Sequence, residues 1–236
     1  MVVKIYLVGG SVRDKLLKRN PTDFDYAVDC ENYQEMRNYV LANGYEIYFE
    51  RPQHRYIKAR KSNFYFVDTF YDFTMCRPNI DDPDGPANIM TDLSRRDFTI
   101  NAMALDESNH LIDPYDGMVD LTEGILDFTG TSDRNIIEDP LRILRAIRFS
   151  SVFGFKLSDR LTASLRNLEV QVLLSGVDKD RIRKELTKMF AHNTIEAMTF
   201  LFESQRLLNF PQLLNFLFTK PGIKLIPVTK EIKIPR

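Results

Sequence analysis

GGSVRD at residues 9–14 and DFD at residues 23–25 are the stretches that decide how the first part of this chain folds. The apolar run at residues 4–8 predicts a strand that ends at the two glycines. Ser11 and Asp14 then have the spacing of a capping box, which predicts the start of a helix. A strand, a glycine turn and a helix in succession are typical of a mixed α/β domain.

The DFD motif has the geometry of a metal site. Residues 24–28 predict a second strand, and side chains at i and i+2 of a strand lie on one face about 6–7 Å apart. Asp23 and Asp25 should therefore lie together, while Phe24 points into the core. Two such carboxylates can hold two metal ions about 4 Å apart, which clamp the attacking and leaving oxygens of a phosphoryl displacement. The alternative is a strand end with solvated carboxylates.

The two glycines predict a phosphate cradle. A strand that runs into Gly9 and Gly10 and then into a helix leaves exposed N–H groups at the positive end of the helix dipole. Ser11 belongs to the same turn, and Arg13 adds a positive charge. These groups should bind a triphosphate, although two adjacent glycines can also form an ordinary turn.

RRDFTINAMALD at residues 95–106 places basic residues and an aspartate before an alternating apolar run. Arg96 could reach a phosphate, and Asp97 could accept a hydrogen bond from a ribose hydroxyl, which would favour ribonucleotides. The alternative is a surface ion pair at the start of a strand.

EDPLRILRAIR at residues 138–148 predicts a helix over 138–153 with a charged and an apolar side, Glu138, Asp139, Arg142 and Arg145 against Leu141, Leu144 and Ile147. Cytosine and adenine present an amino donor beside a ring-nitrogen acceptor, whereas uracil and guanine present the reverse. A carboxylate acceptor beside an arginine donor therefore fits C and A. The alternative is a solvated face on which Asp139 and Arg142 form an i,i+3 pair.

The remaining pattern divides the chain near residue 135 into an α/β part and a helical part. In the α/β part we expect a helix at 31–43, two strands at 55–60 and 63–70 joined by a tight turn, and a mobile loop rich in proline and aspartate at 77–86. After residue 135, helical spacing predicts further helices at 158–168, 178–191 and 194–208.

Composition excludes several classes of protein. The chain of 236 residues has 32 basic and 33 acidic residues, so any nucleic-acid contact must be local. Its two cysteines, Cys30 and Cys76, lie far apart outside any metal-binding spacing, which favours a reducing cytoplasm. We expect no signal peptide and no membrane span, because no uncharged apolar stretch approaches 20 residues.

Taken in order, these motifs resemble the class II tRNA nucleotidyltransferase and bacterial poly(A) polymerase family. The resemblance also takes in DPYDGMVDL at 113–121 and DRIRKELTKMF at 180–190, and it covers about residues 3 to 215. It implies a polymerase-beta-like α/β head with a mixed sheet, followed by an α-helical neck that binds the nucleobase. The expected divisions are a head at 1–135, a neck at 136–220 and a C-terminal extension at 221–236.

The resemblance also implies roles for single residues. Asp23 and Asp25 would bind Mg²⁺, and the triphosphate would lie at Gly9, Gly10, Ser11 and Arg13. The ribose would lie near Arg96 and Asp97, and the base would be read by Asp139 and Arg142 with support from Arg145 and Arg148. Residues 113–121 would form a springlike segment.

Two departures from the family pattern matter. The family usually supplies a third carboxylate two positions before Asp68, where this chain has Phe66, so Asp68 is our candidate. Family members are also generally longer, with body and tail domains after the neck. We expect this chain, which stops at Arg236, to be a minimal enzyme, a fragment or one half of a split pair. A second chain or a homo-oligomer would then supply the missing functions.

The expected activity is template-independent addition of C, A or both, from CTP and ATP, to the 3′ end of tRNA. Poly(A) synthesis is less favoured, because YFERPQHRYIKAR at 48–60 does not match the basic stretch of poly(A) polymerases. The segment 69–93 is near full length for the family, which leans toward A addition. The third possibility is an inactive nucleotide-binding regulator, although the chain keeps Asp23, Asp25 and Arg142.

Overall fold

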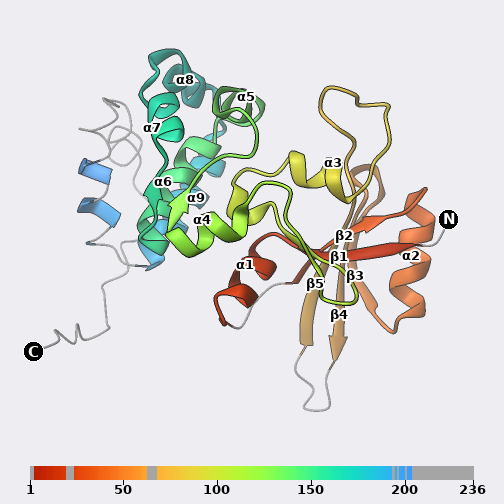
Figure 1. The fold of residues 1–236 in the computed structure, drawn as a ribbon. Helices are drawn as coiled ribbons and strands as arrows, with labels where there is room; N and C mark the ends of the chain where they lie inside the picture. The colour runs from red at the N-terminus through yellow and green to blue at the C-terminus, as the bar shows by residue number, and fades with distance from the viewer. Residues whose placement is uncertain are drawn as a thin grey trace, which may run out of the picture. The chain divides into compact units, whose positions relative to one another are not determined.

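The computed structural model describes residues 3–19, 24–62, 68–192, 195, 197–199 and 201–203. The chain forms two compact units, Met1–Leu121 and Thr122–Arg236, here called the first and second units (Figure 1). The first unit ends before the boundary that we expected near residue 135. Helix α5 (Ser132–Glu138) belongs to the second unit, where it packs on helices α7 (Asp159–Arg166) and α8 (Leu168–Leu173).

The first unit is built on a seven-stranded sheet with the strand order β3-β4-β5-β2-β1-β6-β7. Strands β2 and β5 run parallel and every other neighbouring pair is antiparallel, so the predicted mixed sheet is confirmed. The strands are β1 (Lys4–Val8), β2 (Phe24–Asp29), β3 (Glu46–Arg51), β4 (Tyr56–Ser62), β5 (Asp68–Met75), β6 (Ala104–Leu105) and β7 (Leu111–Ile112).

Apolar clusters pack on both faces of this sheet. On one face, Met36 and Val40 of α2 (Tyr33–Ala42) pack with Phe73 of β5. On the other face, Ile89 and Leu93 of α3 (Ile89–Ser94) pack with sheet residues that include Val8 and Ala27. The strand residues divide between these two apolar clusters because consecutive side chains of a strand point to opposite faces of the sheet.

Short helices complete the first unit. They are α1 (Gly10–Leu16), η1 (Pro52–His54), η2 (Thr99–Asn101) and α4 (Gly117–Glu123). Gly117 is required at the start of α4, because a Cβ there would lie 2.2 Å from the backbone oxygen of Thr99. The Asp113 carboxylate accepts hydrogen bonds from the N–H groups of Gly117 and Met118, both at 2.8 Å, and so caps the helix. The DPYDGMVDL segment is thus a capped helix start packed on the RRDFTIN segment.

The second unit is mainly helical. Its elements are β8 (Ile125–Leu126), α5, α6 (Arg142–Phe153), β9 (Lys156–Leu157), α7, α8, η3 (Leu174–Gly176) and α9 (Lys179–His192). Helices α6 and α9 pack against each other, and each buries an apolar stripe, with Ile143 and Ile147 on α6 and Ile182 and Leu186 on α9. Gly154 ends α6 with a positive φ of 70°.

One helix prediction is wrong in its extent. The expected helix over 138–153 is interrupted, because α5 ends at Glu138 and α6 begins at Arg142. Asp139 lies between them in an extended conformation with φ −149° and ψ 98°. The physical reason is Pro140, which excludes the helical conformation from the residue before it.

Other expected elements agree to different degrees. The strands at 4–8, 24–28 and 55–60 and the helices at 31–43, 158–168 and 178–191 are confirmed. The strand expected at 63–70 is β5, which runs over Asp68–Met75, and residues 63–67 lie outside the described part of the chain. Part of the helix expected at 194–208 also lies outside it, although residues 195, 197–199 and 201–203 are helical. Strand β3 and helix α3 were not predicted.

Among the described residues, no helix has the length and apolar character needed to cross a lipid bilayer. Both cysteine thiols are free and buried.

Candidate active site and nucleotide-binding residues

Strand pairing brings a second carboxylate beside Asp25. Asp25 of β2 and Asp72 of β5 are partners in register in the parallel pair. Neighbouring strands lie about 4.8 Å apart and paired residues point to the same face, so the two carboxylates share one face of the sheet. Asp68, our expected third carboxylate, is the first residue of β5 and pairs with Ser62 of β4. The described pairing of β5 with β2 begins only at Tyr71.

Asp23, the other predicted metal ligand, lies outside the described residues. Among the residues that are described, no three His, Cys, Asp or Glu side chains form a metal-binding group.

Tyr56 and Lys58 of β4 contact Asp72. The Tyr56 hydroxyl donates a hydrogen bond to the Asp72 carboxylate, and Lys58 Nζ lies 3.5 Å from Asp72 Oδ2. Burial raises the pKa of Tyr56, and so do the hydrogen bond to Asp72, the charge of Asp72 and the charge of Asp25. Both carboxylates therefore act on the same phenol, which agrees with their position on one face.

The Gly9 turn lies against both Asp25 and Arg96. Gly9 has φ 69° and ψ −137°, a backbone conformation that residues other than glycine rarely adopt. A Cβ at this position would lie 2.9 Å from Arg96 Nη1 and 3.8 Å from Asp25 Oδ2. The glycine turn, the DFD strand and the RRD segment therefore meet at one point in the first unit.

Ser11 does not form the predicted capping box. No side chain caps α1, whose N-cap residue is Gly9. The buried Ser11 Oγ accepts a hydrogen bond of 3.2 Å from the backbone N–H of Asp25. The hydroxyl thus joins the glycine turn to the DFD strand, which is a positioning role that the local pattern did not reveal.

Arg13 and Asp97 are joined through Asn101. Arg13 Nη1 donates to Asn101 Oδ1 at 2.7 Å, and Asn101 Nδ2 donates to Asp97 Oδ1 at 3.1 Å. All three side chains are buried. Asp97 Oδ1 also accepts from the backbone N–H of Phe98 at 2.9 Å. Sequence reasoning missed Asn101, although its place four residues after Asp97 in RRDFTIN was a signal.

Arg96 is oriented by Asp92. Its Nη2 and Nε lie 2.8 Å and 3.1 Å from Asp92 Oδ2, while Arg77 Nε lies 2.7 Å from Asp92 Oδ1. Burial of Asp92 disfavours its charge, but the two guanidinium groups outweigh burial and lower the pKa of this carboxyl. Asp92 is only 3% exposed, so it remains ionised as a buried counter-ion for both arginines. Arg96 therefore belongs to an ion network around the buried carboxylate of Asp92, together with the more exposed Arg77.

Arg142 in the second unit is buried, and the structure shows which groups hold it. Its Nη1 donates to Asn135 Oδ1 at 2.6 Å and to Glu138 Oε2 at 3.0 Å. Asp139 Oδ2 accepts from Arg181 Nη2 at 2.8 Å, and its Oδ1 accepts from the backbone N–H of Leu141 at 3.2 Å. Asp139, in the extended connection between α5 and α6, and Arg142, at the start of α6, thus each have partners besides one another.

Arg145 and Arg148 converge on Glu185 of α9. Arg148 Nε lies 2.6 Å from Glu185 Oε2, and Arg145 Nη1 lies 3.8 Å from Glu185 Oε1. The guanidinium of Arg148 also lies 4.2 Å from the centroid of the Phe149 ring. Glu185 lies in the DRIRKELTK motif and is 5% exposed. The motif did not reveal that this residue is the counter-ion of two predicted site residues.

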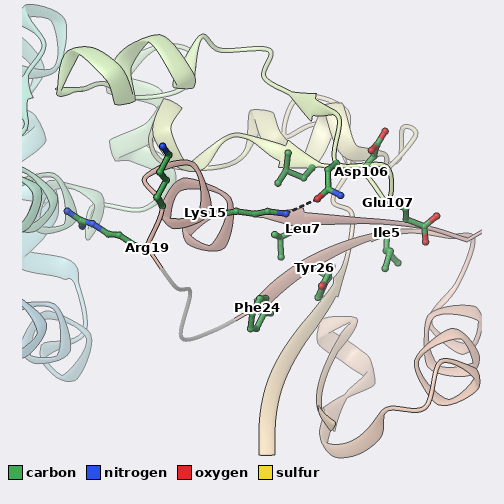
Figure 2. A pocket seen from close by; sticks show the side chains of 11 residues that line it. Ile5, Leu7, Lys15, Arg19, Phe24, Tyr26, Asp106 and Glu107 are labelled. Atoms are coloured by element: carbon green, nitrogen blue, oxygen red, sulfur yellow. Dashed lines mark hydrogen bonds between the residues drawn. The ribbon is translucent and has the colours of Figure 1, made fainter. Parts of the chain in front are cut away.

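A pocket of about 610 Å³ lies on the other face of the sheet (Figure 2). Its lining includes Phe24 and Tyr26 of β2, whose side chains alternate with that of Asp25. Lys15 and Asn109 both line the pocket, and Lys15 Nζ donates to Asn109 Oδ1 at 2.7 Å. Among the described residues, no predicted site residue lines this pocket.

The fold and the meeting of a glycine turn, Asp25 and Arg96 on a mixed sheet are those of a nucleotidyltransferase head domain. The chain belongs to the family of the poly A polymerase head domain, whose family model matches residues 5–127.

Curated relatives carry names of tRNA 3′-end enzymes. The chain is 34% identical over 191 residues to a CCA-adding enzyme of Enterococcus faecalis, covering 78% of this chain and 44% of that protein. It is 35% identical over 197 residues to a multifunctional CCA protein of Stenotrophomonas maltophilia, covering 79% of this chain and 45% of that protein. The chain therefore spans less than half the length of these relatives.

Solved structures agree with this assignment. A tRNA nucleotidyltransferase complexed with a primer tRNA and an incoming ATP analog matches with a TM-score of 0.71 and 28% identity, over 88% of this chain and 59% of that one. The Bacillus stearothermophilus CCA-adding enzyme in complex with CTP matches with a TM-score of 0.69 and 28% identity, over 85% of this chain and 48% of that one. These matches extend beyond the residues of the family model, into the helical second unit.

Proposed function

We propose that this protein is a template-independent nucleotidyltransferase that adds C, A or both, from CTP and ATP, to the 3′ end of tRNA. The observation that carries the proposal is the meeting of the Gly9 turn with Asp25 and Arg96, which puts phosphate-binding groups beside a carboxylate. The names of the CCA-adding relatives and of the complexes with CTP, an ATP analog and primer tRNA support it.

We propose that Mg²⁺ is bound by Asp23 and Asp25, with Asp72 as the third carboxylate. Paired carboxylates on neighbouring strands fit the preference of Mg²⁺ for oxygen ligands. Register favours Asp72 over Asp68, because Asp72 is level with Asp25. When bound, the ions would supply charge stabilisation for the attacking and leaving oxygens.

The nucleotide would be held by the chain's own groups on both sides of the Gly9 turn. Gly9, Gly10 and Ser11 form the turn at the start of α1 that would bind the phosphates, and Arg96 offers a guanidinium that Asp92 orients. The buried Arg13–Asn101–Asp97 network makes Arg13 a positioning residue for this turn. Asp97, whose Oδ1 accepts from Asn101 and from the backbone N–H of Phe98, is proposed to lie near the ribose.

Base selection is proposed to depend on Asp139 and Arg142. Each is held in place by a partner, Arg181 for the carboxylate and Asn135 with Glu138 for the guanidinium. Fixed donors and acceptors discriminate better than mobile ones, because a mismatched base cannot be accommodated by reorientation. Arg145 and Arg148, tied to Glu185, would support this surface.

Poly(A) synthesis is the second candidate, since the matching family model describes a poly A polymerase head domain. An inactive nucleotide-binding regulator is the third.

We further propose a cytoplasmic setting on the basis of the two free thiols.

One assay separates the candidates. Purified protein is incubated with Mg²⁺, labelled CTP or ATP, and tRNAs that lack their last one, two or three nucleotides. CCA completion on all three substrates supports the main proposal, whereas long A tails on any RNA identify a poly(A) polymerase. Nucleotide binding without transfer to any RNA, with or without a second chain, would identify the regulator.

A further inference from the structure

We propose that the face of strands β3, β4 and β5 that carries Asp72 is a stacking platform for the single-stranded 3′ end of the RNA substrate. The platform consists of four aromatic rings, those of Tyr48, Phe49, Tyr56 and Phe70. The proposal rests on the proposed function, because an RNA 3′ end is the acceptor in that reaction.

A bulge in β3 creates the aromatic part of the platform. Ile47 pairs with Ala59 and Phe49 pairs with Lys58, so the register shifts between them and Tyr48 is an extra residue. A bulge of this kind sets two residues of one strand against one residue of its partner. Tyr48 and Phe49 therefore both reach the face on which Lys58 lies, instead of alternating.

Ring contacts show that these side chains share one face. The Tyr48 ring lies 5.3 Å from that of Phe70, and the Phe49 ring lies 6.5 Å from that of Tyr56. Tyr48 is 62% exposed and Phe49 is 43% exposed. The apolar core on this part of the sheet lies on the opposite face, where Ile57 and Phe73 are fully buried. Exposed rings that do not serve the core are available for a ligand.

Cations lie among the rings. Lys58 Nζ lies 5.5 Å from the Phe70 ring centroid, and Arg51 Cζ lies 5.1 Å from the Phe49 ring centroid. Aromatic rings interleaved with lysine and arginine fit single-stranded nucleic acid, because every base offers a face for stacking and every phosphate a negative charge. Arg51 and Lys58 therefore place positive charges among the rings, where they could contact phosphates of RNA.

The platform is continuous with the carboxylates. Tyr56 and Lys58 both contact Asp72, and Asp72 is in register with Asp25 on the next strand. A nucleotide stacked on the rings would therefore lie along the sheet face that leads to the proposed metal ligands. This placement is what a primer terminus needs, because its 3′ hydroxyl must reach the metal site.

The test uses the full chain and the double variant Tyr48→Ala/Phe49→Ala. We expect KM for RNA to rise about tenfold or more, because the bases lose the aromatic rings on which they stack. KM for CTP and kcat at saturating RNA should not change. The matched control is Leu41→Ala, an exposed apolar residue of α2 that lies on the opposite side of the sheet. An unchanged KM for RNA in the double variant would overturn the platform.

A second measurement detects stacking without catalysis. RNA with 2-aminopurine at its 3′ end loses fluorescence when that base stacks, and the chain has no tryptophan to interfere. Quenching by the wild type and its loss in the double variant would support the platform even if no nucleotide were ever transferred. Transfer to RNA that proceeds without quenching would instead reject the platform and leave the proposed function standing.

A third variant separates RNA from a protein partner. Tyr48→Leu/Phe49→Leu keeps apolar area but removes both rings, whereas Tyr48→Phe/Phe49→Tyr keeps two rings. RNA binding should be lost in the leucine variant and retained in the exchanged variant. If the leucine variant bound RNA as well as the wild type does, the exposed rings would be an apolar contact surface and the proposal would be wrong.

Discussion

The two units hold their predicted site residues in different ways. In the first unit, the Gly9 turn, the bond from Asp25 N–H to Ser11 Oγ and the register of β2 with β5 position the Asp25 carboxylate through the backbone, while side-chain networks hold Arg13 and Arg96. In the second unit, buried ion pairs hold the charged side chains, as Glu185 does for Arg148. We therefore expect the fold around Asp25 to tolerate loss of that side chain, whereas the second unit should lose stability when one partner of a buried ion pair is removed.

The sharpest test of this comparison is Asp25→Ala. Because backbone contacts hold the strand, we expect the variant to fold normally and to lose transfer by about a hundredfold to a thousandfold or more. The same result is expected for Asp23→Ala. The control is Asp29→Asn, at the far end of the same strand. Near wild-type kcat at saturating Mg²⁺ in either aspartate variant would refute the metal assignment.

The next largest effect concerns the choice of nucleotide. Each charge-assisted hydrogen bond contributes about 1.5–3 kcal/mol, so the double variant Asp139→Ala/Arg142→Ala should lose about one to two orders of magnitude of discrimination per contact. UTP and GTP should gain relative to CTP and ATP. The measurement is kcat/KM for all four nucleotides. Unchanged ratios would mean that Asp139 and Arg142 only stabilise the second unit.

Replacement of Glu185 tests whether the stability of the second unit depends on its buried ion pairs. Glu185→Gln leaves Arg148 and Arg145 without their shared negative charge, and removal of one partner from a buried pair costs about 3 kcal/mol of unfolding free energy. The exposed pair of Arg183 and Asp180 is the control, and Arg183→Gln should change stability by less than about 1 kcal/mol. Urea unfolding of both variants gives the comparison. Equal losses of unfolding free energy in the two variants would show that the burial of Glu185 does not increase the contribution of its ion pairs to stability.

The smallest effect separates backbone strain from steric clash. Gly9→Ala and Gly44→Ala both place a side chain at positive φ, 69° and 77°, at a cost of about 1–3 kcal/mol. Only Gly9 has a neighbour within reach, since its Cβ would lie 2.9 Å from Arg96 Nη1 while nothing lies within 4 Å at Gly44. We therefore expect both variants to lose stability but only Gly9→Ala to raise KM for nucleotides. A normal KM in Gly9→Ala would place the triphosphate elsewhere.

Local patterns predicted much of the fold. The strands β1, β2 and β4, the helix α2 and the loop after β5 were evident, because their signals lie within a few residues of one another. Strand β3 was missed because its exposed residues Tyr48 and Phe49 break the alternation that marks a half-buried strand. The break at Pro140 was a local signal, which the helical spacing of the following leucines outweighed in our prediction.

By itself, the sequence determined the family motifs, the glycine turn and the alternation that separates Asp25 from Phe24, because each depends on the conformation of consecutive residues. Only the tertiary structure decided which distant residues meet these motifs. Asp72 is level with Asp25 because of the register of two parallel strands, and Glu185 reaches Arg148 across 37 residues because α6 packs on α9. Strand register and helix packing are set by burial of the whole core, and no short stretch of sequence contains that information.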